Sequence, residues 1–402
     1  AGGKVARVVA GISSPPSLWD IADLSRTLPK GVYHLDSKMP TAFHEWLSLG
    51  WALGSYKFTH YKKSEQVPAR LALSAGCEAA KITRYAESIS LARDLINTPA
   101  EDMGPAELAA AIVAVGKNYG AKVTQIIGDA LLKQNYPAIH RVGRASQHAP
   151  RLVDLRWGNA KHPRVTLVGK GVCFDTGGLD IKPSSGMYLM KKDMGGAACA
   201  LAVARMIMDS KLPVCLRLLV PAVENAVSGN AYRPSDIITM RNGKTVEVGN
   251  TDAEGRLILA DALTEAASEN PDLLIDFSTL TGAARTAVGS DISAMFANDD
   301  KLANELQAHG KQMEDPVWRL PLHDAYKKML DSNIADLNSA PNSPYAGAIT
   351  AALFLQHFIG DVKHWAHLDF MAWNPSSRAG RPEGAEAMTV RAVYRLVQER
   401  VG

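Results

Sequence analysis

The sequence predicts an α/β protein of two unequal parts: a large domain whose mostly parallel mixed sheet is covered by helices on both faces, and a small N-terminal α/β domain. From about residue 97 onward, short apolar runs typical of buried strands alternate with longer helical patterns, as in proteins with parallel sheets. The chain of 402 residues is also longer than one hydrophobic core normally supports. A second, smaller domain is therefore expected.

The small N-terminal domain is expected over residues 1–70, because this stretch mixes strand and helix signals and includes FHEWLSLGWALGSYKF. A connecting helix is predicted over 71–96, where LALSAGCEAAKITRYAESISLARDL lacks proline and repeats apolar residues at helical spacing. The turn NTPAEDMGP follows and leads into a second helix. It opens the large domain, which we expect over 97–402.

The large domain contains three clear candidates for buried strands: RVTLVG (164–169), VCLRLLVP (214–221) and DLLIDFSTL (272–280). Helices are predicted in GGAACALAVARMIMDS, between the first and second of these strands, and in GRLILADALTEAASEN, between the second and third. Ligands of such sheets bind at the carboxyl ends of the strands, in the loops that lead into helices. Residues that bind ligands or take part in catalysis are therefore expected in those loops.

Composition excludes several classes of protein. The 44 basic and 41 acidic residues give a formal net charge of +3. This small charge does not predict a broad basic surface for binding nucleic acid or an anionic membrane. Four cysteines are scattered singly, without the spacing of a zinc knuckle or the density of a disulfide scaffold, and this fits a reducing cytoplasm. The early apolar run VVAGI is too short for a membrane span.

Charged residues gather at the predicted strand-to-helix junctions. They lie in GKGVCFDTGGLDIKP after the first strand, at the start of KKDMGGAACALAVA, and in NTDAEGRL before the helix predicted in GRLILADALTEAASEN. The carboxylates are Asp175, Asp193, Asp252 and Glu254, and the cations are Lys170, Lys182 and Arg256. All seven are expected at one edge of the sheet.

Each of these residues taken alone has a structural interpretation. Thr251 and Glu254 fit a capping box, Asp193 fits a helix N-cap, and Lys182 fits a solvated surface lysine. Nucleotide-binding motifs fail here, since Lys170 is followed by glycine rather than Ser or Thr. HEWLS lacks the second histidine of a zinc-protease helix, because its fifth residue is Ser48.

The spacing of Asp252 and Glu254 favours a metal centre. In an extended chain, residues two apart share one face with Cα atoms about 6.6 Å apart, so their carboxylates would repel each other without a cation between them. Oxygen-rich ligation suits Mn²⁺, Mg²⁺ or Zn²⁺, and a pair of ions needs bridging carboxylates. A lysine joins such a centre as a ligand only when it is neutral.

The order Lys170, Asp175, Lys182, Asp193, followed by NTDAEGRL, resembles the cytosolic leucine aminopeptidase family of two-metal exopeptidases. The resemblance extends from NTPAEDMGP to the C-terminus and includes DFSTLTGA, ADLN and WAHLD. The sequence departs from the family in its shorter N-terminal part and in Asp180, where many relatives carry Ser.

The resemblance implies a role for each matching residue. One tightly bound metal would be held by Lys170, Asp175, Asp193 and Glu254, and a more exchangeable one by Asp175, Asp252 and Glu254. Lys182 would stabilise the oxyanion, and Arg256 would anchor a bicarbonate that acts as general base. Met190, Thr279 and Leu280 match positions near the substrate side chain.

The implied activity is hydrolysis of the N-terminal peptide bond of short peptides, with an apolar first residue such as Leu or Met, by a two-metal mechanism using Zn²⁺ and/or Mn²⁺. A cytoplasmic homohexamer without membrane association is expected. Two alternatives stay open: a DNA-binding regulator on the same fold, which the near-neutral charge does not favour, and a two-metal phosphoesterase.

Overall fold

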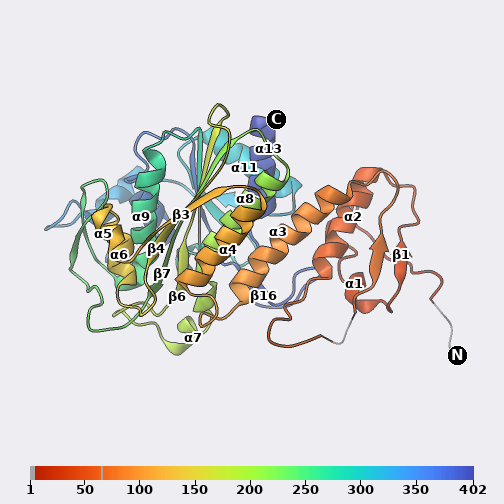
Figure 1. The fold of residues 1–402 in the computed structure, drawn as a ribbon, viewed down its shortest axis with the longest axis horizontal. Helices are drawn as coiled ribbons and strands as arrows, with labels where there is room; N and C mark the ends of the chain where they lie inside the picture. Colours follow the sequence, from red (N-terminus) through yellow and green to blue (C-terminus); the bar gives the residue numbers. More distant parts are fainter. Residues whose placement is uncertain (1–4, 65–66) are drawn as a thin grey trace.

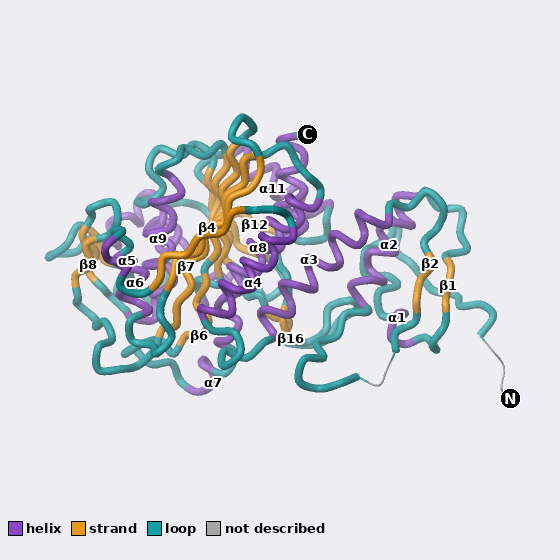
Figure 2. The backbone as a smooth tube through the Cα atoms, viewed as in Figure 1, coloured by secondary structure: helices purple, strands orange, loops and turns teal. Residues whose placement is uncertain are grey.

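The computed structural model describes residues 5–64 and 67–402. In this part of the chain, nine strands form one sheet with the order β12-β11-β14-β10-β5-β7-β4-β3, and β6 also pairs with β7. Pairing is parallel through the centre and antiparallel at β11–β14, β4–β7 and β3–β4, which confirms the mostly parallel mixed sheet. Figure 2 shows the strands of this sheet in orange within the large domain. The strands are β3 (Lys122–Ile127), β4 (Arg151–Gly158), β5 (Arg164–Gly169), β6 (Gly171–Asp175), β7 (Cys215–Asn225), β10 (Leu273–Ser278), β11 (Ser293–Ala297), β12 (Val317–Arg319) and β14 (Trp365–Asp369).

Helices cover both faces of this sheet, as predicted (Figure 1). Alternate residues of a strand point to opposite faces, so in β5 Leu167 joins one buried cluster and Val168 joins the other. One face packs against α3 (Ala79–Asn97), α4 (Pro105–Asn118), α8 (Gly195–Asp209), α11 (Asp300–Gln312) and α13 (Val390–Val401). The other packs against α5 (Ala130–Lys133), α6 (Pro137–Gly143), α9 (Glu254–Ala267) and α12 (Gly347–Gln356).

The small N-terminal part contains α1 (Leu24–Thr27), β1 (Val32–His34), α2 (Thr41–Gly54) and β2 (Arg70–Ala72). A separate apolar cluster holds these elements together, built on Ile21, Leu47, Trp51 and Ala69. Figure 1 shows this part beside the large domain, with α3 running from one to the other.

The connecting helix predicted from residue 71 begins at Ala79, so its predicted start is wrong. Leu71 and Ala72 instead pair with Tyr33 and His34 in the small parallel sheet. Gly76 then takes a φ of +85°, a left-handed conformation that a helix does not allow. Backbone pairing with β1 therefore overrides the helical spacing of the apolar residues.

Short elements lie in the connections between the longer helices and strands. They are α7 (Ser184–Met187), η1 (Met190–Met194), β8 (Ile237–Thr239), β9 (Thr245–Glu247), η2 (Thr251–Ala253), α10 (Gly282–Val288), η3 (Asp324–Leu330), β13 (Leu337–Asn338), β15 (Trp373–Asn374) and β16 (Gly384–Ala385). In the described ranges no helix combines the length and apolarity that crossing a membrane requires.

Candidate metal centre

The charged residues predicted at the strand ends do meet at the carboxyl edge of the sheet. Lys170 directly follows β5, and its backbone is fixed because its N–H donates to Phe277 O and its carbonyl accepts from Ala197 N. Asp175 is the last residue of β6. The remaining carboxylates come from helical turns: Asp193 from η1, Asp252 from η2 and Glu254 from the start of α9.

Three of the carboxylates form a compact cluster. Asp175, Asp252 and Glu254 each offer an oxygen, and these oxygens all lie within 4.8 Å of one another. Asp175 and Glu254 are buried and Asp252 is half-buried. Negative groups this close require cations, because burial removes the water that would otherwise screen them.

Two lysines supply positive charge to the cluster. Lys170 Nζ lies 2.7 Å from Asp193 Oδ2 and 2.9 Å from Glu254 Oε1. Lys182 Nζ lies 2.8 Å from Asp175 Oδ2 and also contacts Asp252 Oδ1. Four carboxylates face two ammonium groups, so the site keeps an excess of negative charge.

The excess negative charge fits divalent metal ions. Glu254 Oε2 is buried without a hydrogen-bond partner among the described residues, which is costly unless a further cation binds there. Four carboxylates and a lysine nitrogen are suitable donors for Mn²⁺ or Zn²⁺. The donor set therefore fits the predicted pair of ions.

The site shifts the pKa values of its own groups. Burial alone would lower the pKa of Lys170, but the charges of Asp193 and Glu254 outweigh burial and raise it. Burial, reinforced by the charge of Asp175, raises the pKa of Asp252 to about 6 and that of Glu254 to about 8. The raised pKa favours the ammonium form of Lys170, so metal binding to this nitrogen would have to displace a proton.

The backbone conformation that brings Asp252 and Glu254 together differs from the predicted one. The extended conformation is wrong, since Thr251–Ala253 forms a 3₁₀ turn and Glu254 begins α9. The capping-box alternative also fails. Asn250, not Thr251, caps the turn by accepting from Asp252 N, while Thr251 Oγ1 donates to Gly177 O at 2.6 Å.

Sequence reasoning missed a group of polar residues that hold the two acidic loops together. Asn225 Nδ2 donates to Asp175 Oδ1 at 2.8 Å and to Thr251 O at 3.0 Å. Asp180 Oδ2 accepts from Thr251 N at 2.7 Å, so the residue that departs from the family pattern binds the NTDAE segment. Asn225 ends β7, and its position at a strand end was the available signal.

Arg256 lies in the first turn of α9 and is buried. Its Nη1 donates to Ser339 O at 2.6 Å, but its Nε is buried without a partner among the described residues. Burial lowers the pKa of Arg256 to about 10. A buried guanidinium with an unused donor is suited to a small anion.

Of the three residues predicted near the substrate side chain, Thr279 contacts residues of the candidate metal centre. Thr279 Oγ1 donates to Asp193 Oδ1 at 2.7 Å, so this hydroxyl orients a predicted ligand. Leu280 and Met190 are half-buried, and Met190 begins the turn that contains Asp193. In the same turn lies Lys192, which the prediction did not single out; burial lowers its pKa to about 8.

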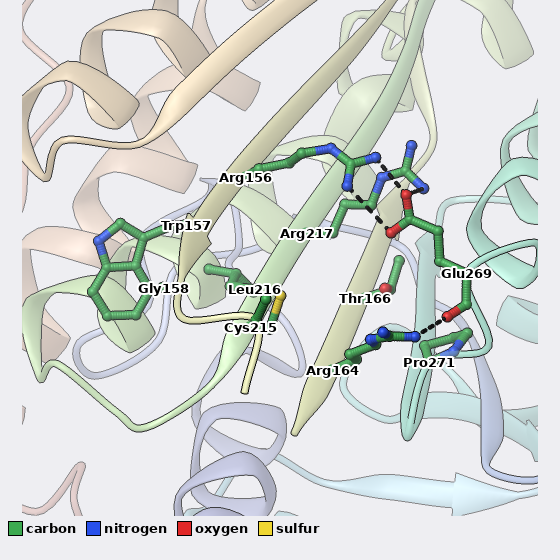
Figure 3. A pocket seen from close by; sticks show the side chains of 11 residues that line it. Arg156, Trp157, Gly158, Arg164, Thr166, Cys215, Leu216, Arg217, Glu269 and Pro271 are labelled. Carbon is green, nitrogen blue, oxygen red and sulfur yellow. Dashed lines mark hydrogen bonds and ion pairs between the residues drawn. The ribbon is translucent and has the colours of Figure 1, made fainter. Parts of the chain in front are cut away.

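A cavity of about 210 Å³ lies at the amino ends of β5 and β7, away from the carboxyl edge (Figure 3). Its arginines already have partners. Arg156 Nη2 lies 2.7 Å from Glu269 Oε1, and Arg217 Nη2 lies 2.8 Å from Asp154 Oδ2. Arg164 Nη1 donates to Glu269 O at 2.8 Å. These pairings indicate a structural charge network.

A mixed sheet covered on both faces, with a buried carboxylate and lysine cluster at its carboxyl edge, defines a metallohydrolase of the α/β class. Comparison with known proteins then gives the family. Residues 90–394 match the family model described as "Cytosol aminopeptidase family, catalytic domain", and residues 1–74 match "M17 aminopeptidase, N-terminal domain". The chain belongs to the cytosol aminopeptidase family and is a metallo-aminopeptidase.

Individual relatives agree with this assignment. The chain is 40% identical to a probable cytosol aminopeptidase of Rickettsia canadensis over 374 residues, which cover 89% of this chain and 75% of that protein. It is 44% identical to peptidase B of Pectobacterium carotovorum over 317 residues, covering 76% and 72% of the two chains.

Solved structures give the same result. The cytosol aminopeptidase of Coxiella burnetii matches with a TM-score of 0.93 and 50% identity, covering 98% of this chain and 89% of that one. The bottromycin maturation enzyme BotP in complex with Mn matches with a TM-score of 0.90 and 30% identity, covering 98% and 94%. These similarities favour an aminopeptidase over a phosphoesterase and lend no support to the DNA-binding alternative.

Proposed function

We propose that this chain removes the first residue of short peptides by a two-metal mechanism and accepts an apolar first residue such as Leu or Met. The observation that carries the proposal is the convergence of Asp175, Asp252 and Glu254, with oxygens within 4.8 Å, between two lysines. An excess of buried carboxylate at the carboxyl edge of the sheet is what two divalent ions require.

The two ions would share ligands. Lys170, Asp193, Glu254 and Asp175 would hold one, and Asp175, Asp252 and Glu254 would hold the other. Mn²⁺ and Zn²⁺ both suit this donor set, and the Mn complex of BotP supports Mn²⁺. When bound, the ions would polarise the scissile carbonyl and make a water molecule more acidic.

The chain's own cations would assist. Lys182 is the less buried of the two lysines, and its ammonium would stabilise the negative charge that develops on the carbonyl oxygen. Arg256 has a buried, unpartnered Nε that supports binding of bicarbonate, which would accept the proton of the attacking water. Met190, Thr279 and Leu280 would contact the first side chain of the peptide. A homohexamer in the cytoplasm is proposed by family resemblance.

Metal titration tests this proposal. Protein stripped with a chelator should bind two Mn²⁺ or Zn²⁺ per subunit by calorimetry, and hydrolysis of leucine p-nitroanilide should return as the sites fill. The substrate p-nitrophenyl phosphate should remain intact in the same preparation. Binding of no metal, or hydrolysis that the chelator leaves unchanged, would contradict a metal-dependent mechanism.

A further inference from the structure

Thr251 connects the two loops that carry the carboxylate cluster. It precedes Asp252, is fully buried, and has a hydrogen-bond partner for each of its polar atoms. Its N–H donates to Asp180 Oδ2 at 2.7 Å, and its Oγ1 donates to Gly177 O at 2.6 Å and accepts from Asp180 N at 2.8 Å. The turn that holds Asp252 is therefore fastened to the loop that follows Asp175.

The carbonyl of Thr251 receives two side-chain hydrogen bonds. Asn225 Nδ2 donates to it at 3.0 Å, and the hydroxyl of Tyr232 donates to it at 2.5 Å. The same Asn225 nitrogen donates to Asp175 Oδ1 at 2.8 Å, so one amide group joins Thr251 to Asp175. Gly178 permits this close approach, because a Cβ there would lie 2.9 Å from Asn225 Oδ1 and 3.0 Å from Thr251 Oγ1.

Tyr232 is almost completely buried. Its exposed fraction is 1%, and its ring belongs to the same buried apolar cluster as Leu257 of α9. Burial, reinforced by the charges of Glu254 and Asp175, raises the pKa of its hydroxyl well above the ordinary value. The hydroxyl therefore remains a hydrogen-bond donor at neutral and mildly alkaline pH.

The loop that carries Tyr232 is itself fixed against the chain that leads to Thr251. Ser235 N donates to Val248 O at 2.8 Å, and Val248 N donates to Asp236 O at 2.9 Å. These two backbone hydrogen bonds hold the loop beside the residues that precede the acidic turn. A tyrosine on a loop held in this way can restrain the Thr251 carbonyl rather than move with it.

The ligands on the other side of the centre depend on different contacts. Asp193 Oδ1 accepts from Thr279 Oγ1 at 2.7 Å. The backbone of Lys170 is held by hydrogen bonds to Phe277 and Ala197. A disturbance of the turn in NTDAE should therefore affect one metal position more than the other.

We propose that Tyr232 and Asn225 act as positioning residues for one of the two metal ions, the one that Asp252 would bind. By holding the Thr251 carbonyl, they set the separation of Asp252 from Asp175. This inference rests on the proposed function and adds to it a difference between the two ions. Loss of a group that orients a metal ligand lowers metal affinity by roughly 10- to 100-fold.

Tyr232→Phe tests this inference, because phenylalanine keeps the buried ring and removes only the hydroxyl. Chelator-stripped protein is titrated with Mn²⁺ by calorimetry, so that the two ions are followed as separate binding steps. In the variant the Kd of the weaker step should rise by roughly 10- to 100-fold, and that of the tighter step should stay as in the wild type. Saturating Mn²⁺ should restore kcat for leucine p-nitroanilide, which it could not do for an unfolded variant.

Two further variants complete the test. Asn225→Ala removes the other donor to the Thr251 carbonyl and should weaken the same step. Tyr119→Phe is the control, since it removes a tyrosine hydrogen bond to Asp209 at the far end of α8 and should change neither step. The inference is overturned if Tyr232→Phe weakens both ions equally, or if it binds both as the wild type does. Failure of the wild type to bind metal would instead overturn the proposed function itself.

Discussion

At the scale of single residues, Glu254 combines two roles in the metal centre. Its Oε1 pairs with Lys170, and its Oε2 is buried without a hydrogen-bond partner among the described residues. It also belongs to the cluster formed with Asp175 and Asp252. Glu254 is thus the residue best placed to contact both ions.

Glu254→Gln should abolish most of the activity while leaving the fold intact. The amide keeps the volume of the side chain but loses the negative charge that would help to hold the two metal ions. We expect kcat/KM for leucine p-nitroanilide to fall by several orders of magnitude, with an unchanged circular dichroism spectrum. The same substitution at Glu269, beside Arg156 on the opposite edge of the sheet, is the control and should keep activity. Near-normal turnover in Glu254→Gln would refute the assignment.

These candidate residues could be predicted from the sequence, because residue types and their spacing do not depend on the backbone conformation. It did not reveal Asn225, whose importance depends on neighbours that are distant in the sequence. Asn225 matters because β7 places it against Asp175.

At the scale of elements, the start of α9 shapes the site through a glycine. A Cβ added to Gly255 would lie 2.6 Å from Lys170 Cε and 2.7 Å from Lys170 Nζ. The absence of a side chain there leaves room for Lys170 to reach Asp193 and Glu254. Gly196 acts similarly at the start of α8, where a Cβ would lie 2.1 Å from Phe277 O.

Gly255→Ala should therefore weaken metal binding by moving Lys170. Alanine is the better helix former by about 1 kcal/mol, so a loss cannot be attributed to helix propensity. Metal affinity measured by calorimetry should fall by at least roughly tenfold, the equivalent of 1.4 kcal/mol. Gly229→Ala, where a Cβ meets nothing within 4 Å, should bind metal normally. Equal affinities in the two variants would contradict this role for Gly255.

Asp261 gives α9 a pH-dependent contribution to stability. Its Oδ2 accepts from Ala138 N at 2.7 Å and its Oδ1 from Arg241 N at 3.1 Å, yet burial raises its pKa to about 7. In the unfolded chain the pKa is about 3.9, so between about pH 4 and 7 the folded state holds the extra proton. This carboxyl therefore makes the protein less stable as pH rises through that window.

Asp261→Asn should remove this part of the pH dependence. Urea midpoints measured from pH 4.5 to 7.5 should fall less steeply with pH in the variant than in the wild type. Parallel curves for the two proteins would show that Asp261 does not titrate in this range.

Most elements around the site could be predicted, since the buried strands and the apolar helices have clear sequence patterns. The 3₁₀ turn at Thr251–Ala253 could not, because it depends on Thr251 bonding to Gly177 and Asp180 in another loop. The start of α3 was missed for a related reason, since Leu71 and Ala72 are held by β1.

At the scale of the whole molecule, Glu314 joins the two domains. It follows α11 in the large domain and receives three hydrogen bonds from the N-terminal part. Its Oε2 accepts from Ser17 Oγ at 2.6 Å, and its Oε1 accepts from Leu18 N at 2.7 Å and Trp46 Nε1 at 2.9 Å. One carboxylate thus fixes two separate segments of the small domain.

Glu314→Gln should loosen this contact. An amide nitrogen cannot accept, so at least one of the three donors loses its partner at a cost of about 1–3 kcal/mol. We expect faster cleavage by trypsin within residues 57–84 and a red shift in tryptophan fluorescence from Trp46. Glu87→Gln, an exposed carboxylate on α3, should leave the cleavage rate unchanged. Identical digestion of the Glu314 variant and the wild type would contradict the role.

The carboxylate and lysine cluster is proposed to serve an enzyme that requires the free N-terminus of its substrate. A peptide amine that binds metal must be unprotonated and unblocked, and its reference pKa is about 7.7 to 8.0. The decisive measurement is kcat/KM at one mildly alkaline pH, with Mn²⁺ supplied, for leucine p-nitroanilide and its N-acetylated form. We predict cleavage of the free amine and essentially none of the acetylated compound. Comparable values for the two compounds would contradict the aminopeptidase mechanism proposed for Asp175, Asp252 and Glu254.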